Sequence, residues 1–197
     1  MATLTTKLEA VNSMLGHIGE APVNTISNAT ALPISASVAV SVLDETSREV
    51  QLQGWHFNTE VDVELTPDGD GNINIPSNAV GVDTVDTSLD VTQRGSRLYN
   101  RKERTYAFDN AVKVHVTYLF DWDELNEHAR RYITLRASRI FQTRMVGSRE
   151  LEALIARDEY MARAALEEAD YQNSDRTIFD NIDAAQRIGI NRNYDIV

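Results

Sequence analysis

The 197-residue sequence contains no cysteine, and this absence excludes disulfide bridges, thiolate nucleophiles and cysteine-based metal sites. It also lacks any run of the roughly 18 apolar residues that a membrane-spanning helix needs. Residues 1–7 (MATLTTK) have neither the basic region nor the apolar stretch of a secretory signal. We therefore expect a protein that does not enter membranes and that is made and assembled in a cytoplasm.

Sequence patterns typical of catalysis or cofactor binding are scarce. The nine glycines form neither of the common phosphate-binding patterns and no nucleophile elbow around a serine. The four histidines, His17, His56, His115 and His128, are too far apart for the usual zinc-ligand spacing. We expect no cofactor, no metal and no catalytic residues, although a three-ligand site assembled by folding stays open.

An excess of acidic side chains is the main feature of the composition. The formal net charge is −11, and the sequence pI is about 4.8. A general nucleic-acid binder needs a basic surface to displace counterions from phosphate, so this balance argues against that class and against binding to anionic membranes. It suits a soluble protein, and it suits a wall past which DNA slides without sticking.

Two apolar patterns near the N-terminus predict helices. Leu4, Leu8, Val11, Leu15 and Ile18 recur at helical spacing. Thr6 and Glu9 have the spacing of a capping box, and Gly19 and Pro22 follow as stop signals. A second helix is expected from about Ser35 to Gln53, with Gly54 as its C-terminal stop.

The pattern changes to strand period between Trp55 and Phe120. Apolar residues alternate with polar ones in 57–65, 73–75 and most clearly 112–118, and residues 80–91 and 97–106 suggest further short strands. Residues 68–72 (DGDGN) superficially resemble a calcium loop, but the positions for glycine and for a bidentate glutamate hold Ile73 and Ala79. A turn between strands is the better interpretation, so we expect an antiparallel β module.

Helical spacing returns after Asp121. Asp121 and Glu124 have capping-box spacing, and an apolar stripe of about 22 residues follows as far as Gly147. Ser148 is a natural N-cap for a fourth helix, whose expected stripe includes Leu154, Ile155 and Met161. A two-residue link between facing stripes predicts an antiparallel helix hairpin.

The predicted fold is therefore α+β: a helical bundle, made of two N-terminal helices plus a C-terminal helix hairpin, with an inserted antiparallel β module. The expected divisions are residues 1–55 and 121–172 for the helical lobe, 56–120 for the β module, and 173–197 for an extended C-terminal tail. The tail is polar and carries isolated apolar residues, so it cannot bury much against its own domain.

Charge is divided unevenly over the helix hairpin. The third helix is rich in arginine and the fourth in carboxylates. One interpretation is pairing within the chain or two solvated faces, which contributes about 0 to 1 kcal/mol per exposed pair. The other is that the two faces meet between neighbouring copies in a ring, because a heterologous interface needs two complementary patches. The candidate ring-interface residues are Arg130, Arg136, Arg139, Arg144, Glu152, Asp158 and Glu159.

The second interpretation predicts that reversing Arg136 and Arg139 to glutamate blocks ring assembly while the monomer stays folded.

A catalytic alternative also exists, because a glycan hydrolase needs only two carboxyl groups about 5 to 10 Å apart. The densest carboxylate set lies at the predicted start of the third helix, and it includes Asp121 and Glu124. Capping already explains these acids, so the enzyme is the weaker interpretation.

Three stretches resemble the tail tubular protein A family, the head-to-tail adaptors of short-tailed bacteriophages. Residues 8–23 (LEAVNSMLGHIGEAPV) look like the opening helix and the turn that follows it. Residues 53–58 (QGWHFN) are similar to the step from the second helix to the β module, and residues 136–141 (RASRIF), with Arg144 and Gly147, look like the third helix and its stop. The three stretches keep order and spacing over essentially the whole chain, and the β module is the least similar part.

The resemblance implies a non-enzymatic virion protein. Adaptors of this kind form a dodecameric ring between the portal protein and the nozzle (tubular protein B), DNA passes through the centre without sequence-specific binding, and tail fibres are a further partner that it allows. It implies that Gly54, Trp55 and Phe57 shape the lobe junction, where Gly54 ends a helix and the aromatic rings anchor the two lobes. It also implies a tail that reaches the portal, with Ile178, Phe179, Ile182 and Tyr194 as candidate portal contacts.

Overall fold

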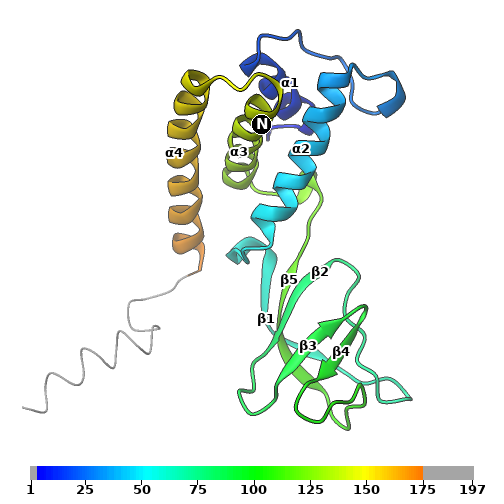
Figure 1. Cartoon of the computed structure of the whole chain (residues 1–197). Coiled ribbons are helices and arrows are strands. Elements are labelled where there is room, and N and C mark those ends of the chain that lie inside the picture. Colours follow the sequence, from blue (N-terminus) through cyan, green and yellow to red (C-terminus); the bar gives the residue numbers. More distant parts are fainter. Residues whose placement is uncertain (1–3, 175–197) are drawn as a thin grey trace, which may run out of the picture.

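The computed structural model describes residues 4–174 and shows an α+β protein with a helical lobe and a β lobe (Figure 1). The chain forms two helices, enters the β lobe, and returns to form two more helices. Two chain segments, near residues 51–58 and 118–122, therefore connect the lobes. The predicted fold class and the insertion of the β module between helices are confirmed. No helix within residues 4–174 is long and apolar enough to cross a membrane.

The two N-terminal helices follow the expected patterns closely. Helix α1 spans Lys7–His17, and Thr6 and Glu9 form the predicted capping box, in which each side chain accepts a hydrogen bond from the other residue's backbone N–H. A short 3-10 turn, η1 (Ala29–Ala31), precedes helix α2 (Ile34–Gln51). Helix α2 thus ends two residues earlier than expected, and Gly54 follows in a left-handed conformation with φ +71°.

The third helix begins later than the sequence pattern predicts. Asp121 and Glu124 do form a capping box, but it caps a short 3-10 turn, η3 (Trp122–Glu124). Leu125 is extended, and helix α3 (Glu127–Met145) starts afresh after Asn126, whose side chain accepts the N–H of Ala129. The predicted 22-residue helix was therefore wrong at its start, because a second N-cap lies five residues beyond the first.

Helix α4 (Arg149–Asn173) completes the predicted hairpin, with Ser148 as its N-cap. It packs on α3 and touches η2 (His56–Asn58), so it stands at the edge of the helical lobe (Figure 1). Only one stripe is buried as a result, consisting of Ile155, Glu159, Ala162 and Leu166. Leu154 and Met161, expected in that stripe, are instead 65% and 62% exposed.

The helical lobe is held by one apolar cluster to which α1, α2, α3 and α4 all contribute. Its largest fully buried side chains include Met14, Leu43, Tyr132 and Phe141. Burial of such a side chain stabilises the fold by about 1.5–3 kcal/mol relative to exposure. This cluster also takes in Trp55 and Trp122, one from each of the two segments that connect the lobes.

The β lobe consists of two small antiparallel sheets. Strands β1 (Thr59–Leu65), β5 (Val112–Tyr118) and β2 (Ala79–Thr84) form a sheet in the order β1-β5-β2. Strands β3 (Val91–Arg94) and β4 (Arg97–Asn100) form a hairpin, and β3 contacts β2. Alternate residues of β5, Val112, Val114 and Val116, point into a second apolar cluster together with Ile73 and Leu98.

Two irregularities in the β lobe have clear local causes. The register of β1 shifts between Glu60 and Val63, and Asp62 there has φ +57°, a left-handed conformation that non-glycine residues rarely adopt. Val61, expected to alternate into the core, is 63% exposed at this bulge. The turn at 67–72 is confirmed, since the Asp68 carboxylate accepts the N–H groups of Asp70 and Asn72.

Candidate functional site

The lobe junction is fixed by two buried side-chain amides, those of Gln51 and Asn58. The amide oxygen of Gln51 accepts the N–H of Phe120 at 2.8 Å, and its NH₂ donates to the Phe120 carbonyl at 3.1 Å. Asn58 donates to the carbonyls of Gln51 and Tyr118 at 2.9 and 2.7 Å. Both side chains therefore join the two connecting segments as a strand pair would, and we call them the amide clasp.

The sequence-predicted junction residues lie beside this clasp. The Trp55 backbone N–H donates to Asn58, and its indole N–H donates to the Val50 carbonyl at 2.8 Å. Phe57 is half-buried against the helical cluster. At Gly54, an added Cβ would lie 3.4 Å from Thr117 Oγ1, so both its positive φ and its close neighbours favour glycine.

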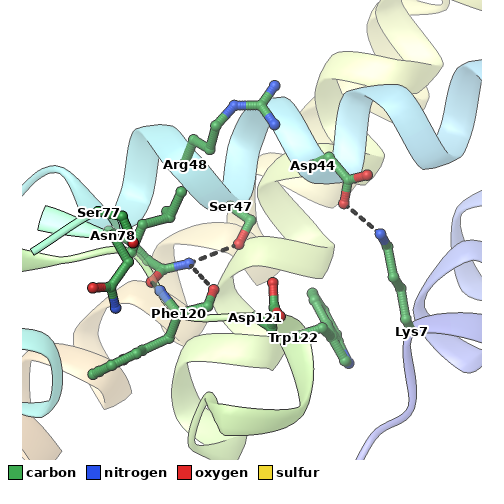
Figure 2. Close-up of a pocket in the computed structure, with 11 residues that line it drawn as sticks. Lys7, Asp44, Ser47, Arg48, Ser77, Asn78, Phe120, Asp121 and Trp122 are labelled. Atoms are coloured by element: carbon green, nitrogen blue, oxygen red, sulfur yellow. Dashed lines mark hydrogen bonds and ion pairs between the residues drawn. The ribbon is translucent and has the colours of Figure 1, made fainter. Parts of the chain in front are cut away.

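A cleft of about 450 Å³ opens at the same junction (Figure 2). Lys7 reaches across from the N-terminal segment to the Asp44 carboxylate on α2, at 2.6 Å. Arg48 and Asp121 also line the cleft. The lining thus carries two cationic and two anionic side chains, an arrangement without net charge.

The carboxylates considered for catalysis have a structural role at this junction. Glu124 accepts the backbone N–H of Asp121 at 3.1 Å, which is one half of the capping box of η3. Both side chains are exposed. Within residues 4–174, no group of three or more histidine and carboxylate side chains is placed to hold a metal ion.

The charged hairpin forms an ion network within the chain. Glu159 on α4 is buried, and it accepts hydrogen bonds from Arg139 at 2.5 Å and from Arg136 at 3.3 Å. Arg136 also binds Glu49 on α2 at 2.9 Å, and Arg144 binds Glu45 on α2 at 3.0 Å. The network therefore joins α2, α3 and α4.

The hydrogen bonds between these arginines and carboxylates shift the pKa values of several of the groups. The hydrogen bond that Arg139 donates to Glu159 raises the pKa of the Arg139 guanidinium despite its partial burial. The hydrogen bond to Arg144 lowers the pKa of the Glu45 carboxyl. Both shifts favour the charged forms of Arg139 and Glu45.

The remaining candidate ring residues occupy different settings. Arg130 is 3% exposed and donates to the carbonyls of Leu125, Asp123 and Thr5. Glu152 lies 3.8 Å from Arg139, and Asp158 is exposed on α4. Pairing within the chain, the first interpretation of the charge pattern, therefore accounts for Arg136, Arg139 and Glu159. A contact between copies through this surface stays a prediction.

The exposed side of α4 is apolar in part. Leu154, Tyr160, Met161 and Tyr171 are all more than half exposed there. An amphipathic helix in a single-chain fold normally turns such residues inward. This side of α4 is therefore a second candidate surface for assembly.

A cluster of cations on the β3–β4 hairpin was not anticipated from the sequence. Residues 94–104 carry five cations, Arg94, Arg97, Arg101, Lys102 and Arg104, against the single acid Glu103. Tyr99 and Tyr106 lie among them: the Arg94 guanidinium is 3.7 Å from the Tyr99 ring centroid, and that of Arg97 is 4.5 Å from the Tyr106 centroid. We call this set the basic hairpin. A count of local charge in an acidic chain would have found it.

The candidate portal contacts Ile178, Phe179, Ile182 and Tyr194 lie outside the described residues.

Fold and surfaces together define a two-lobed α+β protein with charged and apolar surfaces on both lobes. The chain matches the model of a family described as "Tail tubular protein" over residues 8–176. This match spans most of the sequence, so the chain belongs to the tail tubular protein family. The resemblance found in the sequence is confirmed at this level, and it makes the chain a structural component of a phage tail.

The chain is also similar to the "Tail tubular protein A" of Klebsiella phage KP34. The two chains are 33% identical over 127 residues, which is 64% of this chain and 66% of the relative. The alignment thus covers slightly less than two thirds of the relative's length.

Proposed function

We propose that this protein is a head-to-tail adaptor of a short-tailed phage, with a structural and non-enzymatic role. In this role, copies form a ring, twelve-fold as the family resemblance implies, between the portal protein and the nozzle formed by tubular protein B. The observation that carries the proposal is the match to the tail tubular protein family over residues 8–176. Tail fibres are a further partner that this role allows.

The amide clasp supports a mechanical role. An adaptor must hold its two partners in a fixed position relative to each other, so its two lobes must keep a fixed orientation. Gln51 and Asn58 are 0% and 1% exposed. Gln51 bonds to the backbone of Phe120, and Asn58 bonds to the backbone carbonyls of Gln51 and Tyr118. Buried hydrogen bonds of this kind are costly to break, because the separated groups would lie unpaired away from water. The lobes are accordingly expected to move as one body.

The charge balance supports a channel function. A net charge of −11 disfavours tight binding of the phosphate backbone. DNA would then pass through the centre of the ring without being held. The exposed apolar side of α4 and the candidate residues Arg144, Glu152 and Asp158 are surfaces through which copies in the ring could pack, as a heterologous interface requires.

The test is the mass of the purified full chain, alone and with the portal protein of the same phage, by light scattering after size exclusion. We expect a shift from the 22.1 kDa chain to the mass of a closed ring, either alone or on the portal. A chain that stays monomeric and leaves the portal unbound would contradict the adaptor. In that case glycan-cleavage assays on wild type and on Asp121→Asn/Glu124→Gln would test the catalytic alternative.

A further inference from the structure

The basic hairpin is unusual both in its position and in its internal contacts. Arg94 and Arg97 are directly opposite each other in the β3–β4 register. Like charges at such a position are destabilising. Neither side chain forms an ion pair within the described residues, and both are exposed. Stacking on tyrosine rings supports the two guanidinium groups instead, and Arg97 also donates a hydrogen bond to the Asn72 side chain at 3.0 Å. A surface that keeps unpaired cations in an acidic chain is suited to an acidic partner.

The same lobe carries an acidic strand at its other side. Strand β1 is an edge of its sheet, because it pairs only with β5. It contains Glu60, Asp62 and Glu64, all exposed, and no cation of its own, while Lys113 of β5 lies opposite Glu64 in the register. Val61 is exposed between the first two acids. We call residues 60–64 the acidic edge.

The acidic edge is also strained at its centre. Asp62 adopts φ +57° at the bulge, a conformation that costs about 1–3 kcal/mol for most residues and is common at functional positions. The bulge leaves Val61 and Asp62 outside the regular ladder with β5. The edge therefore presents an apolar side chain flanked by carboxylates.

We infer that the basic hairpin of one copy docks on the acidic edge of the next copy in the ring. The inference rests on the proposed ring, and it adds a contact between β lobes to the packing of helical lobes. The basic hairpin contacts β2, whereas β1 lies at the opposite edge of the sheet. A single chain thus holds two different complementary patches, which is the requirement for head-to-tail association into a closed ring.

The chemistry of the two patches matches in detail. Guanidinium groups form paired hydrogen bonds with carboxylates, which favours an arginine-rich surface opposite the exposed carboxylates of the acidic edge. The rings of Tyr99 and Tyr106 are half-buried, and they hold the Arg94 and Arg97 guanidinium groups in place for this contact. A nucleic acid is the competing partner for the same hairpin, and binding of labelled duplex DNA distinguishes it from a second copy of the chain.

Crosslinking gives a direct test, because the chain has no cysteine of its own. Ser96→Cys places a thiol in the turn of the basic hairpin, and Glu64→Cys places one on the acidic edge. Full-length chains are assembled, with the portal if the ring requires it, and treated with a short bis-maleimide. We expect dimers from a mixture of the two single variants and a ladder of larger products from the double variant. The control pairs Ser96→Cys with Thr143→Cys, an exposed position on α3, and should give few products.

Charge exchange gives an independent test. Arg94→Glu/Arg97→Glu and Glu60→Lys/Glu64→Lys should each raise the concentration needed for assembly at least tenfold. A mixture of the two variants should assemble again, because each altered patch then meets an oppositely charged partner. Wild-type assembly should weaken between 0.1 and 1 M NaCl, since the Debye length falls from about 10 to about 3 Å.

The outcomes separate the two proposals. Rings that form normally from both charge variants, with no 96–64 crosslink, would overturn the β-lobe contact and leave the adaptor intact. A chain that stays monomeric with and without the portal would overturn both. Binding of labelled duplex DNA that Arg94→Glu/Arg97→Glu abolishes, in rings that lack the crosslink, would assign the hairpin to nucleic acid and would also overturn the inference.

Discussion

At the scale of single residues, side-chain amides replace backbone pairing where the chain crosses between lobes. Phe120 has no strand partner, and the Gln51 amide satisfies both its N–H and its carbonyl. Asn58 does the same for the carbonyls of Gln51 and Tyr118. Asn58 bonds to the Trp55 backbone, and Gln51 lines the same cleft as Trp122. Directional hydrogen bonds as well as apolar packing therefore hold the junction.

Gln51→Leu should destabilise the protein. The substitution keeps the side-chain volume but removes the partners of the Phe120 N–H and carbonyl. We expect the free energy of unfolding in urea to fall by about 2 kcal/mol, since an unpaired buried polar group costs about 1–3 kcal/mol. Gln53→Leu, at an exposed position on the same segment, should change it by less than about 0.5 kcal/mol. Equal effects of the two variants would remove the role given to the clasp.

Asp68 makes the stability of the turn at 67–72 depend on pH. The backbone N–H of Asn72 holds the pKa of the Asp68 carboxyl below its ordinary value of 3.8. A carboxyl with a lowered pKa stabilises the folded state above its unfolded pKa, and this contribution is lost as pH falls through the folded pKa. Asp68→Ala should therefore lower Tm near neutral pH, and the difference from wild type should close below pH 3.8.

The control for this measurement is Asp70→Ala, whose side chain makes no hydrogen bond within residues 4–174. Its Tm should follow that of wild type at each pH. A Tm difference for Asp68→Ala that stays constant down to strongly acidic pH would show that the carboxylate charge has no part in holding the turn.

At the scale of elements, the α3–α4 hairpin is held by one buried stripe and by the ions around Glu159. The Glu159 side chain is 11% exposed, while Arg136 and Arg139 are 22% and 30% exposed. A carboxylate placed between two arginines in this way is partly desolvated. Removal of the Glu159 carboxylate would leave Arg136 and Arg139 without this partner, close to each other and to Arg144.

Glu159→Ala should lower the free energy of unfolding by about 2 kcal/mol, less than the 3–5 kcal/mol typical of a fully buried pair. Glu152→Ala is the matched control, because Glu152 is 44% exposed and lies 3.8 Å from Arg139. Its effect should stay below about 1 kcal/mol, as for surface pairs. Urea unfolding of both variants gives the comparison, and a larger loss for Glu152→Ala would contradict the buried network.

The same contacts change the outcome expected for Arg136→Glu/Arg139→Glu. The double reversal would place three carboxylates together at Glu159. We therefore expect loss of α4 packing in the monomer, visible as a lower Tm, in addition to any effect on the ring. Substitution of exposed Asp158, which forms no ion pair within residues 4–174, is a better test of a ring contact through this surface.

At the scale of the whole molecule, the described residues form an apolar core in each lobe. A chain ending after Ser174 should fold with an unchanged Tm, and it keeps Tyr171 in helix α4. The proposed role of the C-terminal segment predicts about tenfold or greater loss of affinity for portal rings, or about 1.4 kcal/mol. Portal binding measured by light scattering would refute this role if the shortened chain bound as tightly as the full one.

The sequence alone determined most of the element order. Local signals were sufficient for the Thr6–Glu9 and Ser148 caps, the turn at 67–72 and the valine alternation of β5, because each depends on neighbours within about four residues. They failed at Asp121, where a real capping box closes only a single 3-10 turn, and at Leu154 and Met161, where periodicity cannot tell which side of α4 meets α3.

Contacts between distant residues were decided only by the tertiary structure. The Gln51–Phe120 pair spans 69 residues and the Arg136–Glu49 pair 87, so no spacing rule reaches them. The sequence left open whether the hairpin charges pair within the chain, and packing of α2 and α4 around α3 decided that Arg136, Arg139 and Glu159 do. The acidic edge and the basic hairpin became two sides of one lobe only when the strands paired, because side-chain positions across a sheet depend on strand order and register.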